Sequence, residues 1–201
     1  MTDVALVRTG VANLASVLAA LRRLGVTPDI TTDPARVAGA QVAILPGVGA
    51  FGAGIAALSA HGLDEALRSR AAAGRPLLAV CLGLQLLAAS SDETPGAAGL
   101  GLFDGHVSRF PDTVKVPQLG WNRVTPDPAC ALLAPGHAYF ANSYRLLTPP
   151  AGWHAAYADH GGPFVAALER GPQLACQFHP ELSGPWGLAL LDRWLTAARK
   201  D

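Results

Sequence analysis

The residue best suited to chemistry is Cys81, which lies at the junction of two different patterns in Leu77–Leu87. The apolar run before it predicts a buried strand, and the leucine-rich segment after it predicts a helix. A cysteine on such a turn projects from the sheet near the first amides of the helix, where the local dipole favours the thiolate. Ala79 and Gly83 supply the small neighbours that a nucleophile elbow requires. We therefore predict a thiol nucleophile; the alternative is an ordinary core cysteine.

A base for this nucleophile is offered by His179, which follows the apolar run Leu174–Phe178. Glu181 stands two residues further on, so its carboxylate can hold one ring nitrogen of the histidine while the other exchanges protons with a thiol. Alone, His179 could equally be a structural or exposed histidine. Cys81 and His179 both follow predicted strands, however, and ligands of open α/β sheets bind outside the carboxyl ends of strands. The pair therefore predicts a Cys–His–Glu catalytic site.

A glycine-containing loop follows the apolar strand predicted at Val42–Leu45. Gly47, Val48 and Gly49 could present backbone N–H groups to a negatively charged oxygen, as an oxyanion hole does. The alternative is an ordinary glycine turn. The loop is expected at the same sheet edge as Cys81, which favours the first interpretation.

The composition limits the classes of function. The chain has 201 residues, 50% of them hydrophobic and 15% charged, and its formal net charge is +0. These values predict one domain over residues 1–201, without the basic surplus that binding to nucleic acid or an anionic membrane would use. No apolar run approaches the ~20 residues of a membrane span, and the N-terminus lacks signal-peptide features, so a cytoplasmic location is expected.

The three cysteines, Cys81, Cys130 and Cys176, are odd in number and lack the spacing of a zinc site, which predicts reduced thiols rather than a disulfide framework. Cys176 and His179 lack a third ligand nearby, so we expect Cys176 in the core. No metal and no cofactor is predicted.

The remaining patterns predict an α/β fold whose second half is rich in β-structure. From Gly99 onward, short aromatic segments bounded by turns indicate antiparallel hairpins. Asn13 is a suitable N-cap for the first helix. Further strands are expected at Val4–Val7 and Thr27–Thr31, and helices at Leu14–Leu24, Leu63–Ala73 and Trp186–Ala198.

Val80–Leu87 together with Phe178–Glu181 resembles the class I (triad-type) glutamine amidotransferases. Within this class, four further segments resemble the glutaminase subunits of imidazole glycerol phosphate synthase: Ala12–Val17, Leu45–Ala50, Gln118–Val124 and Tyr139–Tyr144. The resemblance covers nearly the whole chain. It implies a three-layer flavodoxin-like fold with a central, mostly parallel sheet, helices on both faces and a smaller antiparallel sheet.

The resemblance also implies the activity. L-glutamine would be hydrolysed to glutamate and ammonia through a cysteine thioester. The ammonia would pass to a cyclase subunit with a (βα)8 barrel, and the two subunits would form a heterodimer. The cyclase would make imidazole glycerol phosphate and aminoimidazole carboxamide ribotide in histidine biosynthesis. A stand-alone cysteine amide hydrolase of the same fold and a non-catalytic regulatory scaffold are the alternatives.

By position, the resemblance assigns Cys81 as nucleophile, His179 as proton shuttle and Glu181 as its orienting acid. It assigns the oxyanion strand, the substrate contacts and the partner contacts to three sets: Gly47, Val48 and Gly49; Gln85, Ser143 and Tyr144; and Asn13, Trp121, Tyr139 and Leu182. From the residues alone, Trp121 and Tyr139 could be core or interface side chains, and burial tendencies favour the core.

Three positions depart from the family pattern. Arg8 stands where an acid is common, Asn142 where a histidine is frequent, and Leu182 where a basic residue is frequent. Leu182 is the most consequential departure, because the resemblance places that position against the partner, and a leucine cannot form a charge pair there.

Overall fold

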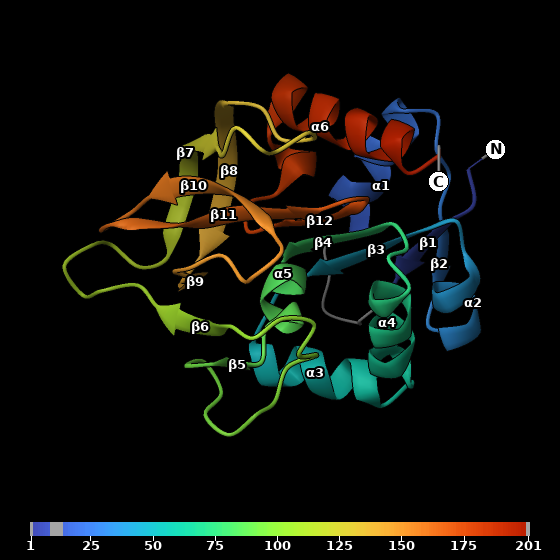
Figure 1. Cartoon of the computed structure of the whole chain (residues 1–201), viewed down its shortest axis with the longest axis horizontal. Helices are drawn as coiled ribbons and strands as arrows, with labels where there is room; N and C mark the ends of the chain where they lie inside the picture. The colour runs from blue at the N-terminus through green and yellow to red at the C-terminus, as the bar shows by residue number, and fades with distance from the viewer. Residues whose placement is uncertain (1, 9–13, 200–201) are drawn as a thin grey trace.

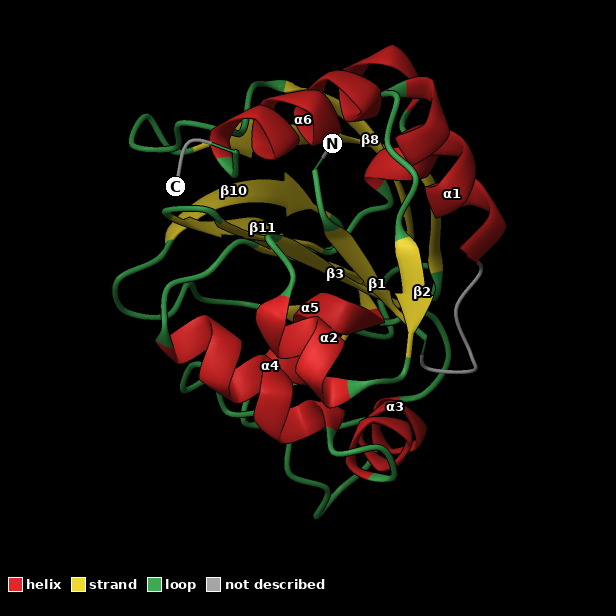
Figure 2. Cartoon of the chain, turned by 90° about the vertical axis from the view of Figure 1, so that its right-hand side faces the viewer, coloured by secondary structure: helices red, strands yellow, loops and turns green. Residues whose placement is uncertain are grey.

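The computed structural model describes residues 2–8 and 14–199, and it consists of a central sheet between two layers of helices (Figures 1 and 2). The helices are α1 (Leu14–Arg23), α2 (Pro34–Gly39), α3 (Phe51–Ser59), α4 (Leu63–Ala72), α5 (Leu82–Leu87) and α6 (Gly184–Ala197), with a short 3-10 helix η1 (Pro180–Leu182). The strands of the parallel half are β1 (Val4–Val7), β2 (Asp29–Thr31), β3 (Val42–Gly47), β4 (Leu77–Cys81) and β12 (Gln173–Cys176). The remaining strands are β5 (Ser90–Ser91), β6 (His106–Arg109), β7 (Gln118–Pro126), β8 (Gly136–Asn142), β9 (Tyr144–Leu146), β10 (His154–Asp159) and β11 (Pro163–Arg170).

The sheet is parallel at one end and antiparallel at the other. Its order is β2-β1-β3-β4-β12-β11-β10-β7-β8, and β5, β6 and β9 branch from it. Strands β2, β1, β3, β4 and β12 are mutually parallel, whereas β11, β10, β7 and β8 pair antiparallel. The α/β class and the β-rich second half expected from the sequence are therefore both confirmed.

Successive side chains along the parallel strands pack into two separate hydrophobic cores. On β4, Leu78 and Val80 belong to the core under α1 and α6, whereas Leu77 and Ala79 belong to the core that α3, α4 and α5 help to form. Burial on both faces explains why these strands read as continuous apolar runs. Figure 2 shows α1 and α6 on one side of the sheet and α2, α3, α4 and α5 on the other.

The predicted elements mostly exist, with shifted ends. The second strand begins at Asp29 rather than Thr27, and the third continues through the predicted glycine loop as far as Gly47. The sequence reading missed α2 and α3. The start of α2 did carry a signal, because Asp33 accepts a hydrogen bond from the N–H of Ala35 (2.8 Å) and Pro34 occupies the first helical position. The N-cap predicted at Asn13 lies outside the described residues.

Strands β3, β4 and β12 end at the same edge of the sheet, so their last residues lie side by side. Gly47 pairs with Cys81, and Cys176 pairs with Val80. The residues that follow these strands, including His179, are therefore gathered at one sheet edge. Among the described residues, no helix combines the length and apolar character needed to cross a membrane.

Candidate active site

Cys81 ends β4 and directly precedes α5, with φ 55° and ψ −111°. Among the described residues it is the one non-glycine residue with positive φ. Such a conformation costs about 1–3 kcal/mol and persists only where the surroundings enforce it. Gly83 is part of those surroundings, because a Cβ there would collide with the carbonyl oxygen of Leu45. The predicted strand-to-helix elbow is confirmed.

His179 and Glu181 form a buried pair at the end of β12. Nδ1 of His179 lies 2.8 Å from Oε1 of Glu181, and both side chains are almost fully buried. The backbone of His179 is held on both sides: its N–H donates to the carbonyl of Tyr139 (2.9 Å), and its carbonyl accepts from the hydroxyl of Ser183 (2.6 Å). The imidazole is thus presented in a fixed orientation with Nε2 free for chemistry.

The environment of His179 favours the imidazolium. Burial disfavours the charged ring, but hydrogen bonds to Cys81 and Glu181 and the negative charges of both outweigh this effect and raise the pKa of His179 to about 10. At neutral pH the ring of His179 is therefore protonated. A protonated ring can act directly as the general acid toward a leaving nitrogen.

A cavity of about 280 Å³ adjoins the cysteine and the histidine. Its lining comes from five places in the chain: the loop after β3, the β4–α5 elbow, the turn after β5, the β8–β9 connection and the residue after Phe178. The lining residues are Val48, Gly49, Cys81, Leu82, Gln85, Glu93, Ala141, Asn142, Ser143, Tyr144 and His179. The structure thus brings together Cys81, His179 and five of the six oxyanion and substrate residues predicted from the sequence.

The sixth, Gly47, does not line this cavity but lies directly behind it. A Cβ at Gly47 would stand 2.8 Å from the backbone nitrogen of Gly83 and 2.8 Å from Cβ of Leu82. Glycine is therefore required at this position because β3 and the elbow approach too closely for any side chain. Its contribution is to the packing of the elbow rather than to the cavity wall.

Several cavity residues were missed by sequence reasoning. Glu93 is the one carboxylate in the lining, and its Oε2 accepts a hydrogen bond from the N–H of Phe51 (2.6 Å). Asn142 was noted only as a departure from the family pattern. Its Oδ1 is buried and receives no hydrogen bond within the described structure, while its Nδ2 donates to the carbonyl of Tyr144 (2.9 Å). A buried acceptor without a donor in a cavity wall suits a ligand that brings its own donor.

A second cavity, of about 180 Å³, lies beside the first. It is lined by Val17, Pro46, Gly47, Val48, Val80, His179, Glu181 and Leu182. His179 and Val48 line both cavities. Leu182 is 41% exposed. The second cavity therefore adjoins the surface on which the partner was expected.

The predicted partner residues are exposed to different degrees. Trp121 is 59% exposed and Leu119, two residues before it, 68%. The expectation that Trp121 is a core residue is therefore wrong: on β7 it alternates with inward-facing residues and points outward. Tyr139 is half-buried and stacks edge-on against Trp121, with the ring centroids 6.2 Å apart. Asn13 lies outside the described residues.

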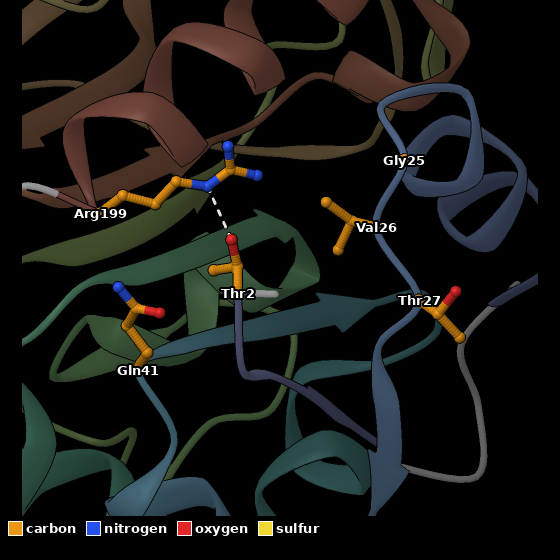
Figure 3. Close-up of a pocket in the computed structure, with 6 residues that line it drawn as sticks. All are labelled: Thr2, Gly25, Val26, Thr27, Gln41 and Arg199. Carbon is orange, nitrogen blue, oxygen red and sulfur yellow. Dashed lines mark hydrogen bonds between the residues drawn. The ribbon is translucent and has the colours of Figure 1, made fainter.

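An alternative site is an open cavity of about 370 Å³ at the opposite edge of the sheet (Figure 3). Figure 3 shows Arg199, whose Nε donates to the hydroxyl of Thr2 (2.6 Å), together with Gly25, Val26, Thr27 and Gln41. These six residues include no cysteine, no histidine and no carboxylate. Within the described chain, no three His, Cys, Asp or Glu side chains are placed to hold a metal. Cys176 is fully buried, as expected.

Comparison with known proteins is consistent with this geometry. The profile of the family described as "Glutamine amidotransferase class-I" matches residues 7–198. Similar proteins include one from Symbiobacterium thermophilum (46% identity, covering 96% of this chain and 93% of that protein), one from Herpetosiphon aurantiacus (38%; 97% and 94%) and one from Moorella thermoacetica (41%; 95% and 93%). Each is named "Imidazole glycerol phosphate synthase subunit HisH".

Solved structures share the fold. A structure described as a glutamine amidotransferase superposes with a TM-score of 0.78 at 21% identity and covers 97% of this chain and 98% of its own. A structure described as a glutamine amidotransferase from Thermotoga maritima gives 0.66 at 14% identity, covering 99% and 83%.

Proposed function

The chain belongs to the class I glutamine amidotransferase family, and we propose that Cys81, His179 and Glu181 hydrolyse L-glutamine for a synthase partner. It is a glutamine amidotransferase subunit of imidazole glycerol phosphate synthase, in histidine biosynthesis. The observation that carries the assignment of residues is the buried His179–Glu181 pair beside a strained Cys81 in one cavity.

In the first step, the thiolate of Cys81 attacks the side-chain carbonyl carbon of glutamine. The developing oxyanion lies near the first turn of α5 and the loop after β3, where the N–H groups of Leu82, Val48 and Gly49 are the candidate donors. The imidazolium of His179 gives its proton to the departing nitrogen, so ammonia leaves and a γ-glutamyl thioester remains.

In the second step, neutral His179 takes a proton from water, which attacks the thioester carbon. Collapse of this second tetrahedral intermediate releases glutamate and restores the thiolate opposite the imidazolium. Glu181 holds Nδ1–H throughout and stabilises the positive charge on the ring.

The cavity wall suits the amino-acid end of glutamine. The carboxylate of Glu93 retains one oxygen that no described group engages, and it is the natural partner for the substrate ammonium. The oxygen of Gln85 and the unpaired oxygen of Asn142 add neutral acceptors. Ser143 and Tyr144 complete the wall near the substrate carboxylate.

The partner is proposed to be a (βα)8-barrel cyclase that receives the ammonia in a heterodimer. Support comes from the exposed apolar side chains Leu119, Trp121 and Leu182, and from the second cavity, which adjoins both the triad and Leu182. A cytoplasmic location is proposed because Cys81 must remain a free thiol, and all three cysteines are free in the structure.

The test is glutamate release from glutamine by the purified chain, alone and with a histidine-pathway cyclase plus its ribonucleotide substrate. We expect little activity alone and a large increase in the full mixture. Cys81→Ala should abolish it without lowering the melting temperature, and Cys130→Ala, a half-buried thiol outside the cavity, is the matched control.

Each of the other outcomes contradicts part of the proposal. High activity of the isolated chain would identify a stand-alone amide hydrolase. Silence in both mixtures, with binding to the cyclase retained, would identify a non-catalytic scaffold. Activity that survives Cys81→Ala would remove Cys81 from the mechanism.

A further inference from the structure

Gln177 is a fully buried glutamine that lies behind the nucleophile and outside the cavity wall. It directly follows β12, and its backbone N–H donates to the carbonyl of Ala166 (2.8 Å). Its side chain reaches in two directions: Oε1 accepts a hydrogen bond from Nε2 of Gln85 (3.0 Å), and Nε2 lies 3.8 Å from Sγ of Cys81. One amide thus joins a residue of the substrate cavity to the sulfur.

The orientation of this amide is determined by a chain of hydrogen bonds that begins at a backbone carbonyl. The carbonyl of Tyr144 can only accept, so the nitrogen of Gln85 must face it (3.3 Å). The same nitrogen donates to Gln177, which fixes Oε1 of Gln177 on that side. The NH2 group of Gln177 is therefore directed at the sulfur. A reversed amide would place its oxygen against a thiolate and two NH2 groups against each other.

The remaining groups around the sulfur have complementary roles. The carbonyl of Ala141, 3.9 Å away, can accept from the thiol but opposes the thiolate. His179 lines the same cavity as Cys81, and the pKa of its ring is raised to about 10, in part by Cys81. Gln177 supplies an N–H that stabilises the negative sulfur and gives up no proton.

We propose that Gln177 is a positioning residue for the reaction: its N–H holds the thiolate of Cys81, and its oxygen ties that position to Gln85 in the substrate cavity. The inference rests on the proposed function, because it assumes Cys81 as the nucleophile. A hydrogen bond to a charged sulfur is expected to change the thiolate fraction by about tenfold.

The experiment compares Gln177→Met with Gln173→Met. Methionine keeps the length of the side chain and removes the donor. Gln173 is the matched control, because it is buried on the preceding strand and its Nε2 donates to the carbonyl of Ala71 (2.8 Å), away from the sulfur. The rate of iodoacetamide labelling of Cys81 is followed against pH by peptide mass spectrometry, and kcat and KM are measured in the complex with the cyclase.

For Gln177→Met we expect the pH midpoint of Cys81 labelling to rise by about one unit and kcat to fall by about tenfold. Gln173→Met should lower the melting temperature but leave the labelling midpoint unchanged. Gln85→Met tests the chain from its other end, because it frees the Gln177 amide to turn. It should raise both the labelling midpoint and KM, and it provides the test if Gln177→Met does not fold.

An unchanged labelling midpoint in both Gln177→Met and Gln85→Met would overturn the inference, as would an equal shift in Gln173→Met. These results are distinct from failure of the proposed function. If that function fails, glutamine hydrolysis is absent from the full mixture, or it continues after Cys81 is labelled or replaced by alanine, whatever the pH profile of Gln177→Met.

Discussion

Replacing Glu181 by glutamine removes a negative charge from the buried pair while it preserves the shape of the side chain. Oε1 of Glu181 now lies 2.8 Å from Nδ1 of His179. In the variant, an amide must occupy this site, and a neutral oxygen replaces a carboxylate as the acceptor. The imidazolium that forms opposite the Cys81 thiolate therefore loses its charged partner.

The size of the effect follows from the bond that is lost. A hydrogen bond to a charged group contributes about 1.5–3 kcal/mol, which corresponds to a loss of about 10- to 150-fold in kcat at ~1.4 kcal/mol per factor of ten. Glu181 is also one of the two groups that raise the pKa of His179 to about 10. Its removal lowers that pKa, so the imidazolium is lost at a lower pH.

The assay is glutamate release in the full mixture with the cyclase, measured from pH 6 to pH 10. We expect the alkaline limb of the kcat profile to move to lower pH by about 1–2 units, the shift that ~1.5–3 kcal/mol produces. Glu169→Gln is the matched control. Glu169 is also a buried glutamate, but its carboxylate accepts from the N–H groups of Ala131 (2.7 Å), Leu132 (3.0 Å) and Leu133 (3.3 Å).

Glu169→Gln should lower the melting temperature and leave the pH profile in place. The reasoning is refuted if Glu181→Gln keeps kcat within about twofold of the unmodified chain, or if the alkaline limb does not move. It is also refuted if Glu169→Gln moves that limb equally, because the shift would then reflect general loosening of the fold.

Two further predictions concern the elbow and the exposed face. In Gly83→Ala, the added Cβ meets the carbonyl of Leu45. This overpacking should destabilise the chain by about 2–3 kcal/mol and lower the melting temperature by roughly 5–10 °C. The control is Gly39→Ala, which should leave the melting temperature unchanged because a Cβ at Gly39 meets nothing. Trp121→Ala should weaken cyclase binding at least tenfold in calorimetric titration, as truncation of an aromatic anchor at an interface does. Leu147→Ala truncates another exposed apolar side chain and should leave the binding unchanged. Equal effects of the two substitutions would show that Trp121 is no anchor.

Much of the site could be predicted because its signals are local in the sequence. The strand–cysteine–helix pattern around Cys81 and the two-residue spacing of His179 and Glu181 depend only on neighbouring residues. Parallel strands then place both at the same sheet edge, since their carboxyl ends coincide there. The buried α/β core was likewise evident from its continuous apolar runs.

What the sequence did not predict depends on contacts between distant segments. Glu93 reaches the cavity from the turn after β5, where its bond to the N–H of Phe51 spans 42 positions in the chain. Gln177 was predicted only as one residue of the buried strand Leu174–Phe178. Its proposed role depends on the side chain of Gln85, which is 92 positions away in the chain and lies beside it in the fold. The core position favoured for Trp121 was wrong because burial tendencies describe residue types only. Which side chains of β7 face outward is determined by its pairing with β8.

Tyr139 on β8 connects the exposed side chain of Trp121 with the backbone of His179. The ring of Tyr139 stacks against exposed Trp121, while its backbone carbonyl accepts from the N–H of His179 (2.9 Å). The N–H of Tyr139 donates to the hydroxyl of Ser183 (3.0 Å), which in turn donates to the carbonyl of His179 (2.6 Å). A partner that covers Trp121 therefore packs on β7, which pairs with the strand that holds the backbone of His179. Docking on Trp121 and the alignment of His179 are thus linked through the paired strands β7 and β8, so a change in the position of β8 would alter both.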